Sequence, residues 1–95
     1  MVIMILKYVK PLEEIDKLLV AHQAFLDGYF KQKKFICAGR QNPRVGGVIL
    51  ANVGSVDEAK AIAKEDPFAV NNVAEYDFIE FAPGKYDEGF ACFLN

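Results

Sequence analysis

Two kinds of hydrophobic pattern alternate along the chain, and together they predict an α+β fold. Val2 to Val9 is a nearly continuous apolar run, which is typical of a strand buried on both faces. Between Pro11 and Lys33 the apolar residues recur at three- and four-residue steps, as in a helix that packs on a sheet. The apolar stripe comprises Leu12, Ile15, Leu19, His22, Leu26 and Tyr29. We therefore expect one long helix after the first strand.

The middle of the chain reads as a hairpin. Phe35 to Arg40 is the second expected strand, and Val48 to Val53, opened by Gly46 and Gly47, is the third. The polar turn between them is short, so the two strands should pair antiparallel. Gly39 lies inside a strand, where glycine indicates a bulge or the close approach of a ligand or helix.

A second helix and a fourth strand follow the hairpin. Ser55 to Glu58 matches a capping box, and Val56 to Lys64 continues as a helix. This helix is expected to end at or before Asp66, because Pro67 disfavours the helical conformation of the residue that precedes it. Val73 to Phe81 is expected to form the fourth strand.

The order strand, helix, strand, strand, helix, strand is the βαββαβ arrangement of the ferredoxin-like fold, an α+β fold with a four-stranded antiparallel sheet. Both helices cover one face, and the strands are apolar on both sides. The simplest cover for the other face is a second copy, so we expect a homodimer with two sheets face to face.

We expect a single domain over residues 1–95, with a core at 1–83 and a C-terminal tail at 84–95. The tail begins polar and ends apolar, so Phe90 to Leu94 should pack on the domain or on the dimer partner. An added strand is one form that this packing can take.

Composition narrows the function classes. The chain is 53% hydrophobic and 25% charged, which excludes a disordered protein. The net charge is −2, and the one basic run, Lys31 to Lys34, stands at a helix end where it complements the helix dipole. Nucleic acid binding is therefore not expected. The apolar start is too short to span a membrane and has no signal-peptide features, so we expect a cytoplasmic protein without a membrane segment.

The two cysteines, Cys37 and Cys92, have neither CxxC nor His/Cys spacing, so no metal site and no disulfide framework is predicted. Both are expected to be buried thiols, and Cys37 is a poor candidate nucleophile because no cation adjoins it in its apolar strand. The chain also lacks a GxGxxG motif, a P-loop and a nucleophile elbow, and no cofactor is expected.

His22 and Asp66 are the candidate catalytic residues. A histidine can take or give a proton near neutral pH, and an adjacent carboxylate fixes its tautomer and stabilises the imidazolium. The alternative interpretation is structural: a single histidine on an apolar stripe is often a core residue, and aspartate before proline is a common helix stop.

Other residues are candidates for substrate binding. Tyr8, Phe68 and Tyr76 can line a pocket for a planar ligand, or they can be core aromatics. Gly39 permits close approach of a ligand, although Gly39, Gly46 and Gly47 also fit turns and bulges. Arg40 and Arg44 can hold a carboxylate or a phosphate, or they can be solvated charges of the turn.

Several of these residues together resemble the YCII-related (YciI-like) family over roughly residues 1–83. The likeness rests on His22 in the first helix, Ala38-Gly39, Gly46-Gly47, the Ser55 to Ala59 helix start, and Asp66-Pro67-Phe68. The resemblance implies a dimeric α+β barrel with a His–Asp pair implicated in catalysis, in a pocket between helix, sheet and partner. It also implies kinship with muconolactone isomerase-like and dehydrochlorinase-type enzymes, which act on small aromatic or lactone substrates.

The chain departs from the family pattern at two positions. The family often has an arginine a few residues before its histidine, where this chain has Leu19, and Gly-Pro where this chain has Gly39-Arg40. Arg40 can supply the charge from another direction. The sequence thus predicts an enzyme that catalyses isomerisation of, or elimination from, a small cyclic or aromatic carbonyl compound. There are two alternatives: a non-catalytic module that binds a small molecule or another protein, and an accessory subunit of a larger enzyme.

Overall fold

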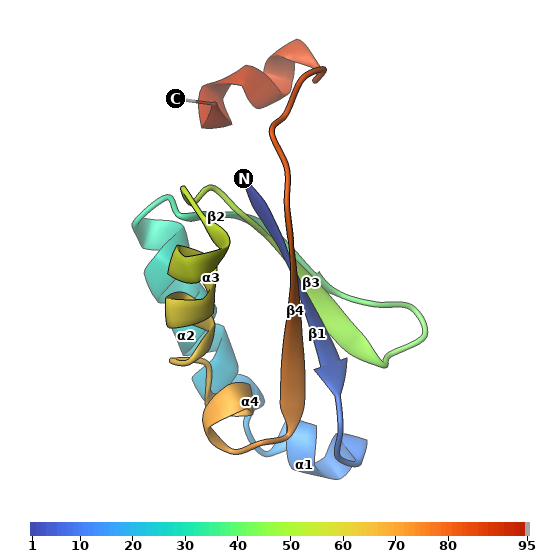
Figure 1. Cartoon of the computed structure of the whole chain (residues 1–95). Coiled ribbons are helices and arrows are strands. Elements are labelled where there is room, and N and C mark those ends of the chain that lie inside the picture. Colours follow the sequence, from blue (N-terminus) through green and yellow to red (C-terminus); the bar gives the residue numbers. More distant parts are fainter. Residues whose placement is uncertain (95) are drawn as a thin grey trace.

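A computed structural model describes residues 1–94, in which helices lie on one side of a four-stranded sheet (Figure 1). The elements are β1 (Val2–Tyr8), α1 (Leu12–Asp16), α2 (Leu19–Lys31), β2 (Phe35–Arg40), β3 (Gly46–Ala51), α3 (Val56–Ala63), α4 (Pro67–Val70), β4 (Ala74–Glu80) and the 3-10 helix η1 (Glu88–Phe93). Asn95, the last residue of the predicted domain, lies outside the described residues. Within 1–94, no helix has the length and apolarity to cross a membrane.

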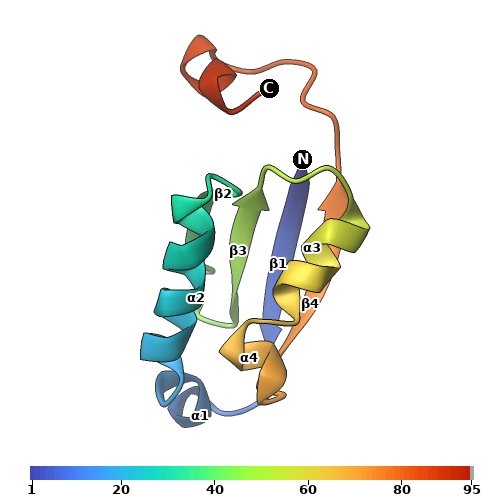
Figure 2. The same cartoon turned by 90° about the vertical axis from the view of Figure 1, so that its left-hand side faces the viewer.

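The sheet has the strand order β2-β3-β1-β4 with every pair antiparallel, which confirms the predicted ferredoxin-like α+β fold. Central strand β1 fixes the register, since Met4 lies opposite Ile49 on one side and Phe78 on the other. Figure 2 shows the helices in front of the sheet, with α2 over β2 and β3 and with α3 and α4 over β1 and β4.

The core lies between these two layers. The residues of β1 that face the helices, Val2, Met4 and Leu6, are at most 2% exposed. They pack against buried residues of the helices and of the other strands, including Ile15, Leu26, Ile49, Ala59, Ile62 and Phe68. The small alanines of α3 allow that helix to lie close to the sheet.

The long helix expected between Pro11 and Lys33 is interrupted. The backbone leaves the helical conformation at Leu18, with φ of −106° and ψ of 1°, and α1 and α2 are separate helices. No glycine or proline marks the break, and the apolar stripe continues across it, because Ile15 and Leu26 both belong to the core. Lys33 then ends the helical region in the left-handed conformation, with φ of 60°.

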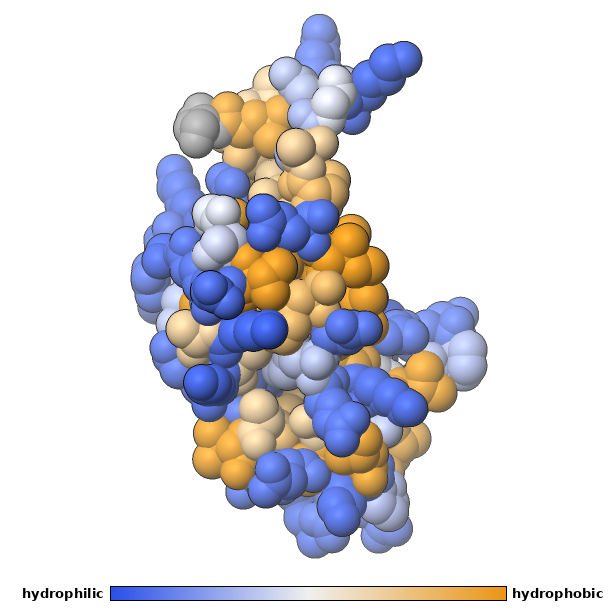
Figure 3. Space-filling view, viewed as in Figure 1, coloured by the Kyte–Doolittle hydropathy of each residue, from blue (hydrophilic) through white to orange (hydrophobic). Residues whose placement is uncertain are grey.

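The second face of the sheet is not covered by any described element of the chain, as Figure 1 shows with the sheet nearly edge-on. By register this open face carries Ile3, Ile5, Cys37, Val48, Leu50 and Ile79. Ile3 and Ile5 are therefore half-buried rather than fully buried as predicted, and Ile79 is 49% exposed. In Figure 3, one group of hydrophobic residues lies at the upper part of this side, above a region that is mainly hydrophilic.

Both cysteines are exposed in the single chain, so the prediction of buried thiols is wrong. A register shift between Phe35 and Cys37 places a bulge at this point of β2 and directs Cys37 onto the open face. Gly39, where the bulge was expected, pairs regularly with Val48, and a Cβ built on it would meet nothing within 4 Å.

After β4 the chain runs away from the sheet and ends in η1 (Figure 1), so the added strand considered for this segment does not form. The backbone carbonyl of Phe93 accepts a hydrogen bond from the side-chain amide of Asn52 at 2.7 Å. Phe90 and Phe93 contact each other with ring centroids 5.4 Å apart, and Phe93 is 37% exposed.

Gly46 and Gly39 give a matched pair of substitutions for testing the sheet. A Cβ on Gly46 would lie 1.8 Å from the carbonyl oxygen of Leu6, so Gly46→Ala has to displace backbone and should cost about 3 kcal/mol of stability. Gly39→Ala has free space and should be neutral or stabilising by up to about 1 kcal/mol. Urea unfolding at one protein concentration measures both; equal midpoints for the two variants would contradict this packing.

Candidate active site

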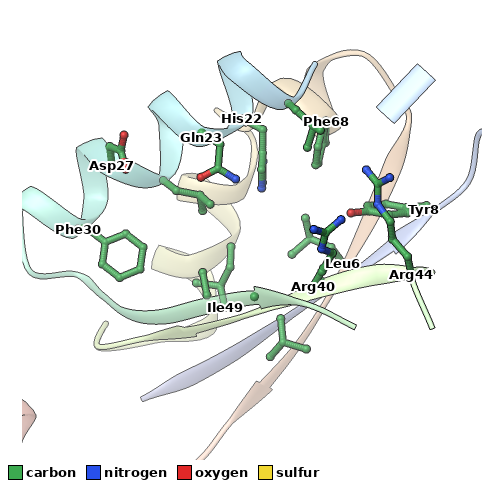
Figure 4. Close-up of a pocket in the computed structure, with 16 residues that line it drawn as sticks. Leu6, Tyr8, His22, Gln23, Asp27, Phe30, Arg40, Arg44, Ile49 and Phe68 are labelled. Atoms are coloured by element: carbon green, nitrogen blue, oxygen red, sulfur yellow. The ribbon is translucent and has the colours of Figure 1, made fainter. Parts of the chain in front are cut away.

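A cavity of about 360 Å³ lies between α2 and the sheet (Figure 4). Leu19, His22 and Leu26 of α2 form one wall, and residues of β1, β2, β3 and the β2–β3 connection form the opposite one. Phe68, from α4, also lines the cavity. Its size suits a ligand of one or two rings.

Asp66 owes its position to the local sequence. It stands before Pro67 in an extended conformation and caps α4, because its Oδ1 accepts a hydrogen bond from the N–H of Phe68 at 2.9 Å. Pro67 fits the first helical position because its missing N–H would have no partner there. The sequence indicated the end of the preceding helix here, and the structure adds that Asp66 starts a new short one.

The carboxylate of Asp66 is fully buried and has three donors from three elements. His22 Nδ1 of α2 lies 2.8 Å from Oδ1, which also accepts from the Phe68 N–H of α4. The hydroxyl of Tyr76 in β4 donates a short hydrogen bond to Oδ2. A buried carboxylate without partners would cost several kcal/mol, on the order of its desolvation penalty, and these donors offset that cost.

Tyr76 is a site residue whose role the sequence did not indicate. It was a candidate for lining a pocket, whereas in the structure it does not line the cavity and its hydroxyl donates a hydrogen bond to Asp66. Burial, followed by the negative charge of Asp66 and the hydrogen bond to it, raises the pKa of Tyr76 well above its usual range. Tyr76 therefore stays a neutral donor at physiological pH. Its position depends on the register of β4, which no local motif encodes.

The ring of His22 is fixed from two directions. Nδ1 is bonded to Asp66, and the ring stacks on Phe68 with centroids 4.0 Å apart and planes 10° apart. Tyr8 meets Phe68 edge to face at 6.0 Å. Figure 4 shows the far end of the His22 ring directed into the cavity, so Nε2 is the nitrogen available to a ligand. The four predicted residues His22, Asp66, Tyr8 and Phe68 thus form one cluster.

The predicted residues of the hairpin also reach the cavity. Gly39, Arg40 and Arg44 line it, whereas Gly46 does not. Arg44 is more than a solvated turn charge, since a terminal guanidinium nitrogen lies 2.5 Å from Asp16 of α1 and the side chain is 25% exposed. That hydrogen bond is the largest cause that raises the pKa of Arg44.

Three lining residues of α2 were missed by the sequence reasoning: Gln23, Asp27 and Phe30. Gln23 and Asp27 are polar residues outside the predicted apolar stripe, and both are exposed. They line the cavity from α2, which lies over the edge strand β2. Within residues 1–94, no group of three histidine, cysteine or acidic side chains is placed to hold a metal ion.

The contact with Asp66 predicts the tautomer of the single histidine. Because a carboxylate accepts only, neutral His22 should carry its proton on Nδ1 and leave Nε2 unprotonated, which ¹⁵N NMR shifts of the labelled imidazole report directly. In Asp66→Asn the fraction of this tautomer should fall, since a neutral amide oxygen accepts a weaker bond. Tyr76→Phe should preserve it, because Oδ1 is unchanged. A wild-type ring protonated on Nε2 would contradict the arrangement.

Comparisons with known proteins agree with this fold. The structure of 5-chloro-2-hydroxyhydroquinone dehydrochlorinase (TftG) from Burkholderia phenoliruptrix AC1100, in complex with 2,5-dihydroxybenzoquinone, superposes with a TM-score of 0.71 at 18% identity, covering 86% of this chain and 94% of that one. No curated protein matches the sequence significantly. The family model of the YCII-related domain matches residues 1–82. The chain therefore belongs to the family of proteins with a YCII-related domain.

Proposed function

We propose that the protein is a small-molecule enzyme in which His22 is the general base and acid and Asp66 orients it. One observation carries the proposal: Nδ1 of His22 is held by a fully buried carboxylate while the opposite end of the ring faces the cavity. A histidine with one nitrogen held and the other directed at a ligand site is the arrangement that general base catalysis uses.

The chemistry would proceed through proton transfer at a carbon next to a carbonyl group. His22 Nε2 takes the proton, and the electron pair of the broken C–H bond moves to give an enolate. The enolate then either receives the proton from the imidazolium at another carbon, which is an isomerisation, or expels a leaving group, which is an elimination. Asp66 keeps its hydrogen bond to Nδ1 and stabilises the imidazolium in both cases.

The substrate class follows from the cavity and from the structural neighbour. A volume of about 360 Å³ and the aromatic walls of Phe68 and Tyr8 suit a small cyclic compound. The neighbour TftG acts on a chlorinated hydroxyhydroquinone and was captured with a dihydroxybenzoquinone. We infer that this chain acts on a small cyclic or aromatic carbonyl compound as well.

Solvent exchange tests the proposal without knowledge of the natural substrate. The protein is incubated in D₂O with a panel of hydroxyquinones and unsaturated five-membered lactones, and deuterium uptake at carbon is followed by mass spectrometry. His22→Gln should reduce the exchange rate of an active compound about a hundredfold or more, and Asp66→Asn should also reduce it. Asp57→Asn, an exposed carboxylate of α3, is the matched control and should exchange like the wild type.

Circular dichroism of each variant confirms that the fold is retained. Exchange that persists in His22→Gln would overturn the role of His22. Ligand-dependent thermal stabilisation without exchange or product across the panel would favour the alternative of a binding module.

We also propose that two copies pack their open sheet faces together to form a homodimer. The exposed apolar residues of this face, Ile79 at 49% and Val48 at 39%, would be buried by such an arrangement. A two-fold axis supplies each face with an identical partner. The thiols of Cys37 and Cys92 are both free, which fits a reducing compartment, so we propose the cytoplasm as the location of the protein.

Ile79→Asp tests the dimer. A charge on the open face should separate the copies, because a buried unpaired carboxylate is costly. Light scattering at micromolar concentration should give about twice the chain mass of 10.6 kDa for the wild type and one chain mass for Ile79→Asp. Val20→Asp, on the outer side of α2 and 86% exposed, is the control and should leave the mass unchanged. A monomeric wild type would refute the proposal.

A further inference from the structure

The two cations that line the cavity differ in how they are paired. The ionised residues of the lining are Arg40, Arg44 and Asp27. Arg44 is paired with Asp16 of α1, whereas none of the ion pairs among residues 1–94 involves Arg40. Arg40 is therefore the cation of the lining that can pair with a bound anion, and cavity walls of low dielectric strengthen this interaction.

Arg44 is only partly satisfied by its surroundings. A terminal nitrogen of its guanidinium group is paired with Asp16, which holds the side chain at the cavity wall. Its Nε is buried and has no hydrogen-bond partner within residues 1–94. A buried donor without a partner is costly, on the order of 1–3 kcal/mol in typical proteins, and a ligand oxygen that accepts from it would remove that cost.

Arg40 supplies a second guanidinium group from the end of β2. It is exposed, and no acidic side chain pairs with it among the described residues. Figure 4 shows Arg40 and Arg44 directed from the hairpin into the cavity, towards the region that His22 and Phe68 close on the opposite side.

We propose that the substrate is a ring compound bearing a carboxylate, which binds to Arg40 and Arg44 while the ring lies against Phe68 and beneath Nε2 of His22. This inference rests on the proposed function and names its substrate class. A carboxylate fits because its two oxygens match the fork of donors that a guanidinium group presents. The arginines and His22 lie on opposite walls of the cavity. A carboxylate bound at the arginines would therefore position the reacting ring carbon near Nε2 of His22.

The test compares binding of benzoate with binding of its neutral isostere benzamide, measured as dissociation constants by NMR titration. The wild type should bind benzoate at least about tenfold more tightly than benzamide. Arg40→Gln and Arg44→Gln should each weaken benzoate binding by about tenfold and leave benzamide binding unchanged. Lys60→Gln, which removes an exposed cation of α3 outside the cavity, is the matched control and should bind like the wild type.

His22→Gln separates this inference from the proposed function. It should keep the preference for benzoate while it loses deuterium exchange, because recognition of the charge and transfer of the proton use different residues. Equal affinities of the wild type for benzoate and benzamide, or unchanged benzoate binding in Arg40→Gln, would overturn the carboxylate site. Arg40→Gln breaks no contact with α1, so its result stands even if Arg44→Gln loses the link to Asp16 and unfolds.

Discussion

The buried carboxylate of Asp66 is the constraint on which the site depends. With no exposed surface, it has to be paired, and its donors come from α2, α4 and β4. These elements are distant in the sequence but meet here, so folding and assembly of the site are one event. Loss of a single donor would leave the buried carboxylate without one of its hydrogen bonds. This would lower the stability of the protein more than the loss of an ordinary surface contact.

The ferredoxin-like topology explains why His22 and Asp66 meet on the helical layer. The first half of the fold contributes α1 and α2 to this layer, the second half contributes α3 and α4, and the cavity lies between α2 and the sheet. The hairpin joining the halves lies across from the histidine. One wall of the cavity therefore carries His22, while the other carries Arg40 and Arg44, and the apolar core packs behind both walls.

Features that depend on the local sequence pattern could be predicted from the sequence, whereas features that depend on strand register could not. The strands, the capping box and the segment Asp66-Pro67-Phe68 follow from residue chemistry within a few positions. The bulge before Cys37 and the contact of Tyr76 with Asp66 depend on pairing between distant strands. The break after α1 has no local signal, because the apolar stripe serves both helices and tertiary packing decides the direction of the chain.

The tripeptide from Asp66 to Phe68 supplies the hydrogen-bond acceptor for His22, the start of α4 and the surface on which the imidazole stacks. Three consecutive residues thus set much of the surroundings of His22, whereas Arg40 and Arg44 come from the end of β2 and from the β2–β3 connection. The surroundings of His22 and the two arginines of the cavity are therefore encoded in separate segments of the chain. A substitution in one segment can change that wall of the cavity and leave the other wall in place.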